Sequence, residues 1–154
     1  MKRLRILLAD HRSEIRSALR IILEPAYHVV GEADNGQAAV AGVRTSRPDL
    51  ALVDIDLPVA SGVETIRELH NICPDCRLIV YGSYLEPDVM AAAFDAGVSG
   101  YVIKGSDRDL LSTIQPVIKQ LWNENQESGR NADDWAASWV PGNGQVERRV
   151  QRTA

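Results

Sequence analysis

The chain has 154 residues, of which 45% are hydrophobic and 25% charged, which supplies enough apolar material for one compact core. Its formal net charge of -4 gives no general attraction for phosphate backbones, so we expect no direct contact with nucleic acid. No apolar stretch approaches the roughly 20 residues that span a bilayer, and the first residues lead into a strand instead of a signal-peptide segment. We therefore expect a cytoplasmic protein without membrane contact.

Strand-like and helix-like segments alternate along the chain. Short apolar runs predict strands over residues 4–9, 27–33, 50–53, 78–81 and 101–103. Helical spacing of apolar residues predicts a first helix capped by Ser13 and ended by Pro25, then helices over 37–45, 63–72 and 88–96, and a last helix from Asp107. Asn35 and Gly36 open the second helix, and Pro87 suits the first turn of the fourth. Five such repeats predict an α/β fold, a parallel sheet with helices on both faces.

Charged residues close three of the expected strands. Asp10 follows the first strand, Asp54 the third and Lys104 the fifth. Ligand chemistry in parallel sheets gathers outside the carboxyl ends of the strands, so we expect two carboxylates and a lysine in one crevice. Each residue alone has an ordinary explanation as a helix cap, a turn residue or a solvated lysine, but their coincidence favours a site.

Two stretches resemble a known family. They read PDLALVDIDLP at residues 48–58, with Gly62 after them, and AGVSGYVIK at residues 96–104. Both are similar to the receiver domain of bacterial two-component response regulators, and the second to the subgroup that carries LuxR-type DNA-binding domains. The resemblance covers about residues 3–121. It implies a flavodoxin-like (CheY-like) five-stranded parallel sheet with strand order 2-1-3-4-5.

The resemblance also implies roles for single residues. Asp54 would be the phosphoacceptor, taking its phosphoryl group from a phosphohistidine on a sensor histidine kinase. Asp10 and Asp54 would hold Mg²⁺ with the backbone carbonyl of Asp56, and Lys104 would pair with the phosphoryl group. A divalent cation would offset the charge of the acids and of the phosphoryl oxygens. The domain would not be an enzyme beyond its own phosphotransfer and dephosphorylation.

His11 departs from the family pattern, which has a second acid at this position as a direct metal ligand. Mg²⁺ prefers oxygen ligands, so an imidazole should lower the affinity for it. His11 could instead favour Mn²⁺, although a polar loop side chain is the simpler interpretation.

Gly82 is a second departure, because receivers place a Thr or Ser there whose hydroxyl links the phosphoryl group to an aromatic residue on the fifth strand. Ser83 could substitute only if the backbone bends, since neighbouring strand residues point to opposite faces. Tyr101 keeps the aromatic position. We therefore expect the switch formed by Gly82, Ser83 and Tyr101 to be impaired.

Cys73 and Cys76 form a C-x-x-C pair between a helix and a strand. A zinc site would need further soft ligands, and a thioredoxin-like motif should open a helix after a strand. We expect two half-buried thiols around a proline turn.

The chain changes character after Leu121. Pro116 should kink the last helix, which lies on the surface that receivers use for output and dimerisation. We divide the chain into a receiver domain at residues 1–121 and a tail at 122–154, where a short helix would place Trp135 and Trp139 on one face. That helix would pack on its own domain or dock another protein. By resemblance, the tail is too short for a LuxR-type DNA-binding domain, so the chain is a receiver without one or a fragment.

These features predict a signalling receiver with an atypical site and weak metal binding. The alternative is a phosphorylation-independent interaction module, or pseudo-receiver, that forms a homodimer or binds a partner through the last helix and the tail. A small flavodoxin-like ligand-binding or catalytic domain is less favoured, because no glycine-rich phosphate loop follows the first strand.

Overall fold

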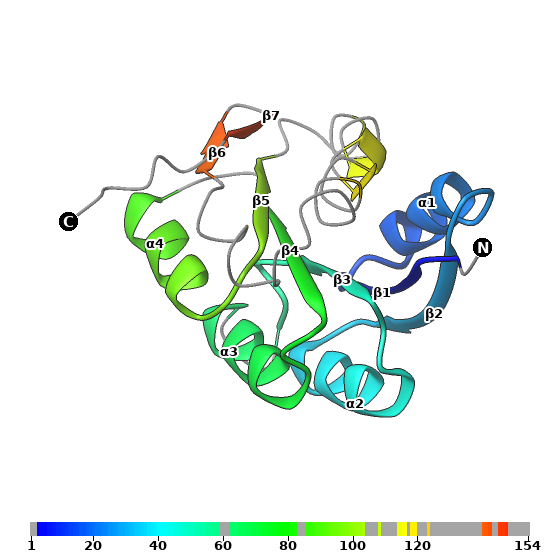
Figure 1. Cartoon of the computed structure of the whole chain (residues 1–154), viewed down its shortest axis with the longest axis horizontal. Helices are drawn as coiled ribbons and strands as arrows, with labels where there is room; N and C mark the ends of the chain where they lie inside the picture. The colour runs from blue at the N-terminus through cyan, green and yellow to red at the C-terminus, as the bar shows by residue number, and fades with distance from the viewer. Residues whose placement is uncertain are drawn as a thin grey trace.

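The computed structural model describes residues 3–58, 62–82, 86–103, 108, 114–116, 118–119, 123, 140–142 and 145–147. Strands and helices alternate as expected up to residue 103 (Figure 1). The strands are β1 (Arg5–Ala9), β2 (His28–Ala33), β3 (Leu50–Asp54), β4 (Arg77–Gly82) and β5 (Gly100–Ile103). The helices are α1 (Ser13–Leu23), α2 (Gly36–Ser46), α3 (Gly62–Ile72) and α4 (Pro87–Asp95). Residues 114–116 and 118–119 are also helical, in the region of the expected last helix.

The five strands form one parallel sheet in the order β2-β1-β3-β4-β5, which confirms the expected topology. Side chains on a strand point alternately to the two faces, and both faces are covered here. Ile6 and Leu8 join α1 and the helical residues Ile114 and Ile118 in one buried cluster. Leu7 belongs to a second buried cluster on the opposite face.

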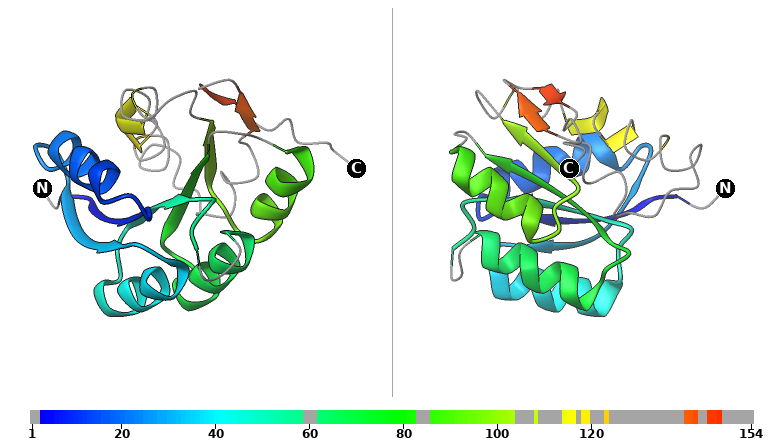
Figure 2. Two further views of the ribbon diagram at one scale, coloured as in Figure 1. Left: turned by 180° about the vertical axis from the view of Figure 1, so that it is seen from behind. Right: turned by 60° about the vertical axis from the view of Figure 1, so that its left-hand side comes forward.

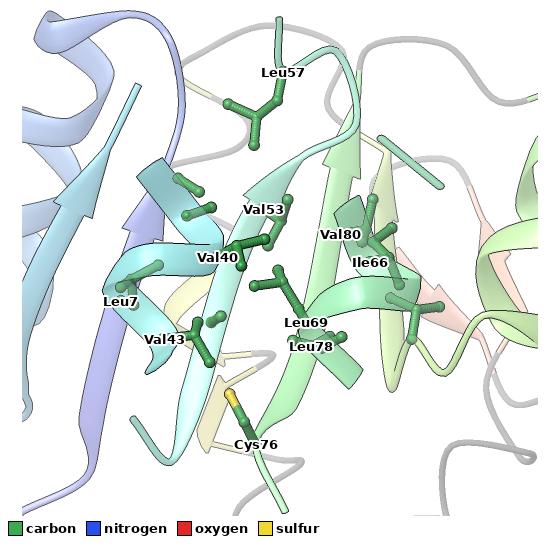
Figure 3. Packing of buried hydrophobic residues seen from close by; sticks show 14 of the residues in the cluster. Leu7, Val40, Val43, Val53, Leu57, Ile66, Leu69, Cys76, Leu78 and Val80 are labelled. Atoms are coloured by element: carbon green, nitrogen blue, oxygen red, sulfur yellow. The ribbon is translucent and has the colours of Figure 1, made fainter. Parts of the chain in front are cut away.

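Figure 3 shows this second cluster, in which helices α2 and α3 pack on the sheet. Val40 and Val43 come from α2, and Ile66 and Leu69 come from α3. In Figures 1 and 2, α1 lies on one side of the sheet and α2 and α3 on the other. Burial on both sides explains why the central strands read as continuous apolar runs instead of alternating ones.

The helix starts were predicted correctly in two cases and wrongly in one. Asn35 caps α2, because its side-chain oxygen accepts a hydrogen bond from the backbone N–H of Ala38 at 2.8 Å. Pro87 lies in the first turn of α4. The expected Ser13 cap is wrong: Ser13 is already helical, and Arg12 occupies the cap position without a side-chain cap bond. Arg12 has a different partner, described below.

The two cysteines are free thiols and are more buried than expected. Burial, with a smaller contribution from the neighbouring Cys73, raises the pKa of the Cys76 thiol. Both side chains belong to the cluster beneath α2 and α3. Their setting is therefore that of core residues.

A feature that we did not expect follows in the tail. Strands β6 (Val140–Gly142) and β7 (Gln145–Glu147) pair antiparallel as a separate hairpin, which lies beside β5 (Figures 1 and 2). The predicted helix with Trp135 and Trp139 lies outside the described residues, as do several residues needed to judge a kink at Pro116. None of the helices in the described ranges is both long enough and apolar enough to cross a membrane.

Candidate functional site

Asp10 and Asp54 lie together at the carboxyl edge of the sheet, as the strand-end pattern predicted. Ala9 on β1 is paired with Val53 on β3, so the residues that follow them emerge side by side. Both carboxylates are buried, with exposed fractions of 0% and 2%. His11 bridges them, its Nδ1 lying 3.8 Å from Oδ1 of Asp10 and 3.8 Å from Oδ2 of Asp54. Lys104 and Ser83, the other expected members, lie outside the described residues.

Arg12 binds the carboxylate of Asp10 through three hydrogen bonds. Its backbone N–H and its Nε donate to Oδ1 at 2.8 and 3.1 Å, and its Nη2 donates to Oδ2 at 3.0 Å. The hydroxyl of Tyr81 donates to the same Oδ2 at 2.9 Å. Burial alone would raise the pKa of Asp10, but the bonds from Arg12 and Tyr81 outweigh it and hold the pKa below its usual value. Asp10 is therefore ionised in a fixed orientation.

The two oxygens of Asp54 have different surroundings. Oδ1 accepts a hydrogen bond from the backbone N–H of Asp56 at 2.9 Å. Oδ2 lies on the side of Nδ1 of His11 at 3.8 Å and Nη2 of Arg12 at 3.9 Å. The N–H of Asp56 thus fixes the rotation of the carboxylate, and Oδ2 is the oxygen that faces the Arg12 guanidinium.

Asp10, His11 and Asp54 form the one described group of side chains whose ligand atoms lie within 4.8 Å of one another, as a metal ion would need. The arrangement nevertheless fits Mg²⁺ poorly. Each oxygen of Asp10 already accepts a hydrogen bond from Arg12, whose guanidinium also approaches Asp54. A divalent cation between these acids would meet a permanent positive charge, and His11 adds a nitrogen where Mg²⁺ prefers oxygen.

Gly82 faces the side of the sheet on which Tyr101 is buried. A Cβ atom at Gly82 would lie 3.0 Å from the Tyr101 hydroxyl oxygen and 2.7 Å from Cγ2 of Ile55. Tyr101 is 1% exposed, and burial, with the charges of Asp56 and Asp54, raises its pKa to about 12. The Tyr101 hydroxyl therefore fills space that a larger side chain at Gly82 would need.

The site contains two residues that were not predicted from the sequence, Arg12 and Tyr81. The sequence does contain a signal for Arg12, because a basic side chain two residues after an acid at a strand end can fold back and bind that acid. Tyr81 carries a weaker one. It stands at the end of an apolar strand and faces the same side of the sheet as Ile79, and only the strand order brings its hydroxyl to Asp10.

Comparison with known proteins identifies the family. Residues 6–115 match the response regulator receiver domain. The chain is 38% identical over 102 residues to the DNA-binding transcriptional activator DevR/DosR of Mycobacterium tuberculosis, a match that covers 65% of this chain and 47% of the relative. It is 32% identical over 101 residues to the chemotaxis protein CheY of Thermotoga maritima, covering 65% and 84%. The chain thus spans about half the length of DevR/DosR and most of the length of the CheY protein.

Two solved structures give the same result. The crystal structure of a LuxR-family two-component response regulator from an Aurantimonas species superposes with a TM-score of 0.67 at 30% sequence identity, covering 77% of this chain and 87% of that one. A CheY-like receiver domain from Methanospirillum hungatei gives a TM-score of 0.68 at 27% identity, covering 80% and 99%. The fold, the matched residues and the acids at the sheet edge agree, and this chain belongs to the response regulator receiver domain family of two-component signal transduction.

Proposed function

We propose that Asp54 is the phosphoacceptor of this receiver and that a sensor histidine kinase is the donor. Receivers are signalling domains rather than enzymes acting on a separate substrate. The observation that supports Asp54 is the asymmetry of its carboxylate. Oδ1 is held by the Asp56 N–H, which leaves Oδ2 directed toward Arg12 and His11.

The proposed step is an in-line displacement at phosphorus. Oδ2 of Asp54 forms a phosphorus–oxygen bond while the phosphorus–nitrogen bond of the donor phosphohistidine breaks. The donor nitrogen keeps the electron pair of the broken bond. Lys104 is proposed to pair with the transferred group, because it directly follows β5 in the sequence and the strands of a parallel sheet end at one edge.

The cation requirement of this site is proposed to be unusual. Receiver domains bind Mg²⁺ at an acidic site, and Asp10 and Asp54 form such a cluster here. We expect weak Mg²⁺ binding with His11 in place of a second acid, and Mn²⁺ as the metal that tolerates the imidazole better. The backbone carbonyl of Asp56 remains the proposed third ligand for any metal that binds.

Switching is proposed to be weak. Gly82 has no hydroxyl that could link the phosphoryl group to Tyr101. Loss of one charge-assisted hydrogen bond removes roughly 1.5–3 kcal/mol from the free energy by which phosphorylation would favour the active over the inactive conformation. Tyr101 is buried next to Gly82, so little movement is left for phosphorylation to cause. Beryllofluoride, a phosphoryl mimic, should then change few amide chemical shifts around β5. Large shifts across β5 and α4 would show that Ser83 or another group couples the two sites.

Intact mass tests the phosphoacceptor. Wild-type protein is incubated with acetyl phosphate, with and without Mg²⁺, and the phosphoryl adduct is measured over time. Asp54→Asn should abolish the adduct, whereas Asp56→Asn should keep it because that side chain is exposed and acts only through its backbone. An adduct that forms at the wild-type rate in Asp54→Asn would remove Asp54 from this role.

A second candidate is a phosphorylation-independent interaction module, favoured by the engagement of Asp10 with Arg12. In that case the last helix and the tail would bind a partner, or a second copy of the chain, in the same way for wild type and Asp54→Asn.

Three further statements remain predictions. They are the boundary between receiver and tail at residue 121, the cytoplasmic location, and the absence of nucleic-acid contact. DNA binding is attributed to the longer relative DevR/DosR by its name.

A further inference from the structure

The guanidinium of Arg12 lies where two acids converge. It donates through Nε and Nη2 to the two oxygens of Asp10 at 3.1 and 3.0 Å, and Nη2 lies 3.9 Å from Oδ2 of Asp54. Its side chain is 22% exposed, whereas those of the two acids are 0% and 3% exposed. A permanent cation is thus held between two buried carboxylates.

The geometry of this contact is specific to arginine. The planar guanidinium presents parallel N–H groups that match both oxygens of a carboxylate, and the resulting bonds are charge-assisted. Two carboxylates so close together would repel each other without a cation between them. Arg12 supplies that charge from within the chain.

We propose that Arg12 is a built-in cation that holds Asp10 and Asp54 in register in place of a divalent metal ion. This inference rests on the proposed phosphoacceptor function of Asp54 and adds its regulation. The site keeps its geometry in the absence of added metal and binds Mg²⁺ only weakly as long as Arg12 stays on Asp10. Arg12 is a positioning residue for Asp54. It attracts the Asp54 carboxylate by its charge, and it fixes the neighbouring Asp10 carboxylate by hydrogen bonds.

The first turns of α1, which Arg12 caps, offer a matched control. Arg16 donates through Nη1 to the backbone carbonyl of Asp10 at 2.6 Å and through Nε to Glu32 at 3.1 Å. Arg16→Gln removes an arginine one turn away and leaves the hydrogen bonds of both site carboxylates in place. Arg12→Gln removes the cation from between them and keeps a polar side chain.

Metal binding is measured directly on the full chain. Mn²⁺ is titrated and followed by loss of the electron paramagnetic resonance signal of the free ion, and Mg²⁺ is tested by the shift that it causes in the thermal unfolding midpoint. Wild type and Arg16→Gln should respond weakly to both ions. Arg12→Gln should bind them on the order of tenfold more tightly or better, the scale of effect known for groups that contact metal ligands. Arg12→Lys keeps the charge but loses the fork, so it should bind both ions more tightly than the wild type and less tightly than Arg12→Gln.

Three results would overturn the proposal. One is tight Mg²⁺ binding by the wild type, equal to that of Arg12→Gln. Another is equal affinity in Arg12→Gln and Arg16→Gln. The third is a wild-type phosphoryl adduct that disappears when EDTA removes divalent ions. If Arg12→Gln does not fold, the wild-type titration and the Arg12→Lys comparison still decide the question. Failure of any phosphorylation, together with tighter metal binding in Arg12→Gln, would refute the phosphoacceptor function and leave this inference intact.

Discussion

The close contact between Gly82 and Tyr101 makes a strong prediction about stability. In Gly82→Ala the added methyl group would lie 2.7 Å from Cγ2 of Ile55 and 3.0 Å from the Tyr101 hydroxyl oxygen. Both distances are shorter than ordinary van der Waals contact. Ile55 is partly exposed and can shift, whereas Tyr101 is 1% exposed and packed beneath α4. The variant must therefore displace Ile55, Tyr101 or the backbone of β4.

The size of the effect follows from two opposing contributions. Overpacking a filled core costs about 1–3 kcal/mol. Replacing a strand glycine by alanine recovers about 0.5–1 kcal/mol, because alanine loses less conformational freedom on folding. We expect a net loss of about 1–2 kcal/mol in the free energy of unfolding, measured by urea denaturation at neutral pH. For a chain of this size, each kilocalorie should lower the thermal midpoint by roughly 2–4 °C.

A double-mutant cycle identifies the contact responsible. Ile55→Ala removes Cγ2, the atom nearest to the new methyl group. Gly82→Ala should therefore cost less in the Ile55→Ala background, with a coupling energy of about 0.5–3 kcal/mol. If Gly82→Ala is as stable as the wild type and the coupling is zero, the space beside Tyr101 is open and our reasoning about this switch is wrong. In that case a Thr or Ser at this position could restore a hydroxyl without strain.

Three further predictions concern the acid cluster and its tyrosines. His11→Asp should raise Mg²⁺ affinity in a thermal-shift titration, because it adds an anionic oxygen ligand, and no change would mean that the site does not bind metal as receivers do. Tyr81→Phe should lower the free energy of unfolding by roughly 1.5–3 kcal/mol, since it removes a buried donor to ionised Asp10, and a neutral result in urea denaturation would contradict that bond. Burial raises the pKa of Tyr101 to about 12, so its contribution to stability is complete below pH 10 and is lost as the pH rises toward 12. Tyr101→Phe should accordingly show a shallower alkaline loss of stability than the wild type, whereas identical slopes would assign that loss to other groups.

The sequence predicted the sheet because the relevant signals are local. Each strand is a short apolar run, each helix has its own spacing and punctuation, and parallel order follows from the alternation of the two. The meeting of Asp10 and Asp54 was predictable for the same reason, since residues that close neighbouring parallel strands emerge at one edge. The hairpin of β6 and β7 also had a local signal, Asn143-Gly144 between its strands, which the sequence analysis overlooked.

Other features depended on side chains from distant segments meeting in space. Arg12 was not among the predicted site residues, and only its folded position shows it on Asp10 and near Asp54. The missing hydroxyl at Gly82 was read from the sequence, but the filling of that space by Tyr101 required the packing of β4 against β5. Local periodicity and turn chemistry are properties of the chain, and they determined the fold and the place of the acids. Which atoms approach within hydrogen-bonding distance depends on rotamers and tertiary packing, and this decided the charge and the shape of the site.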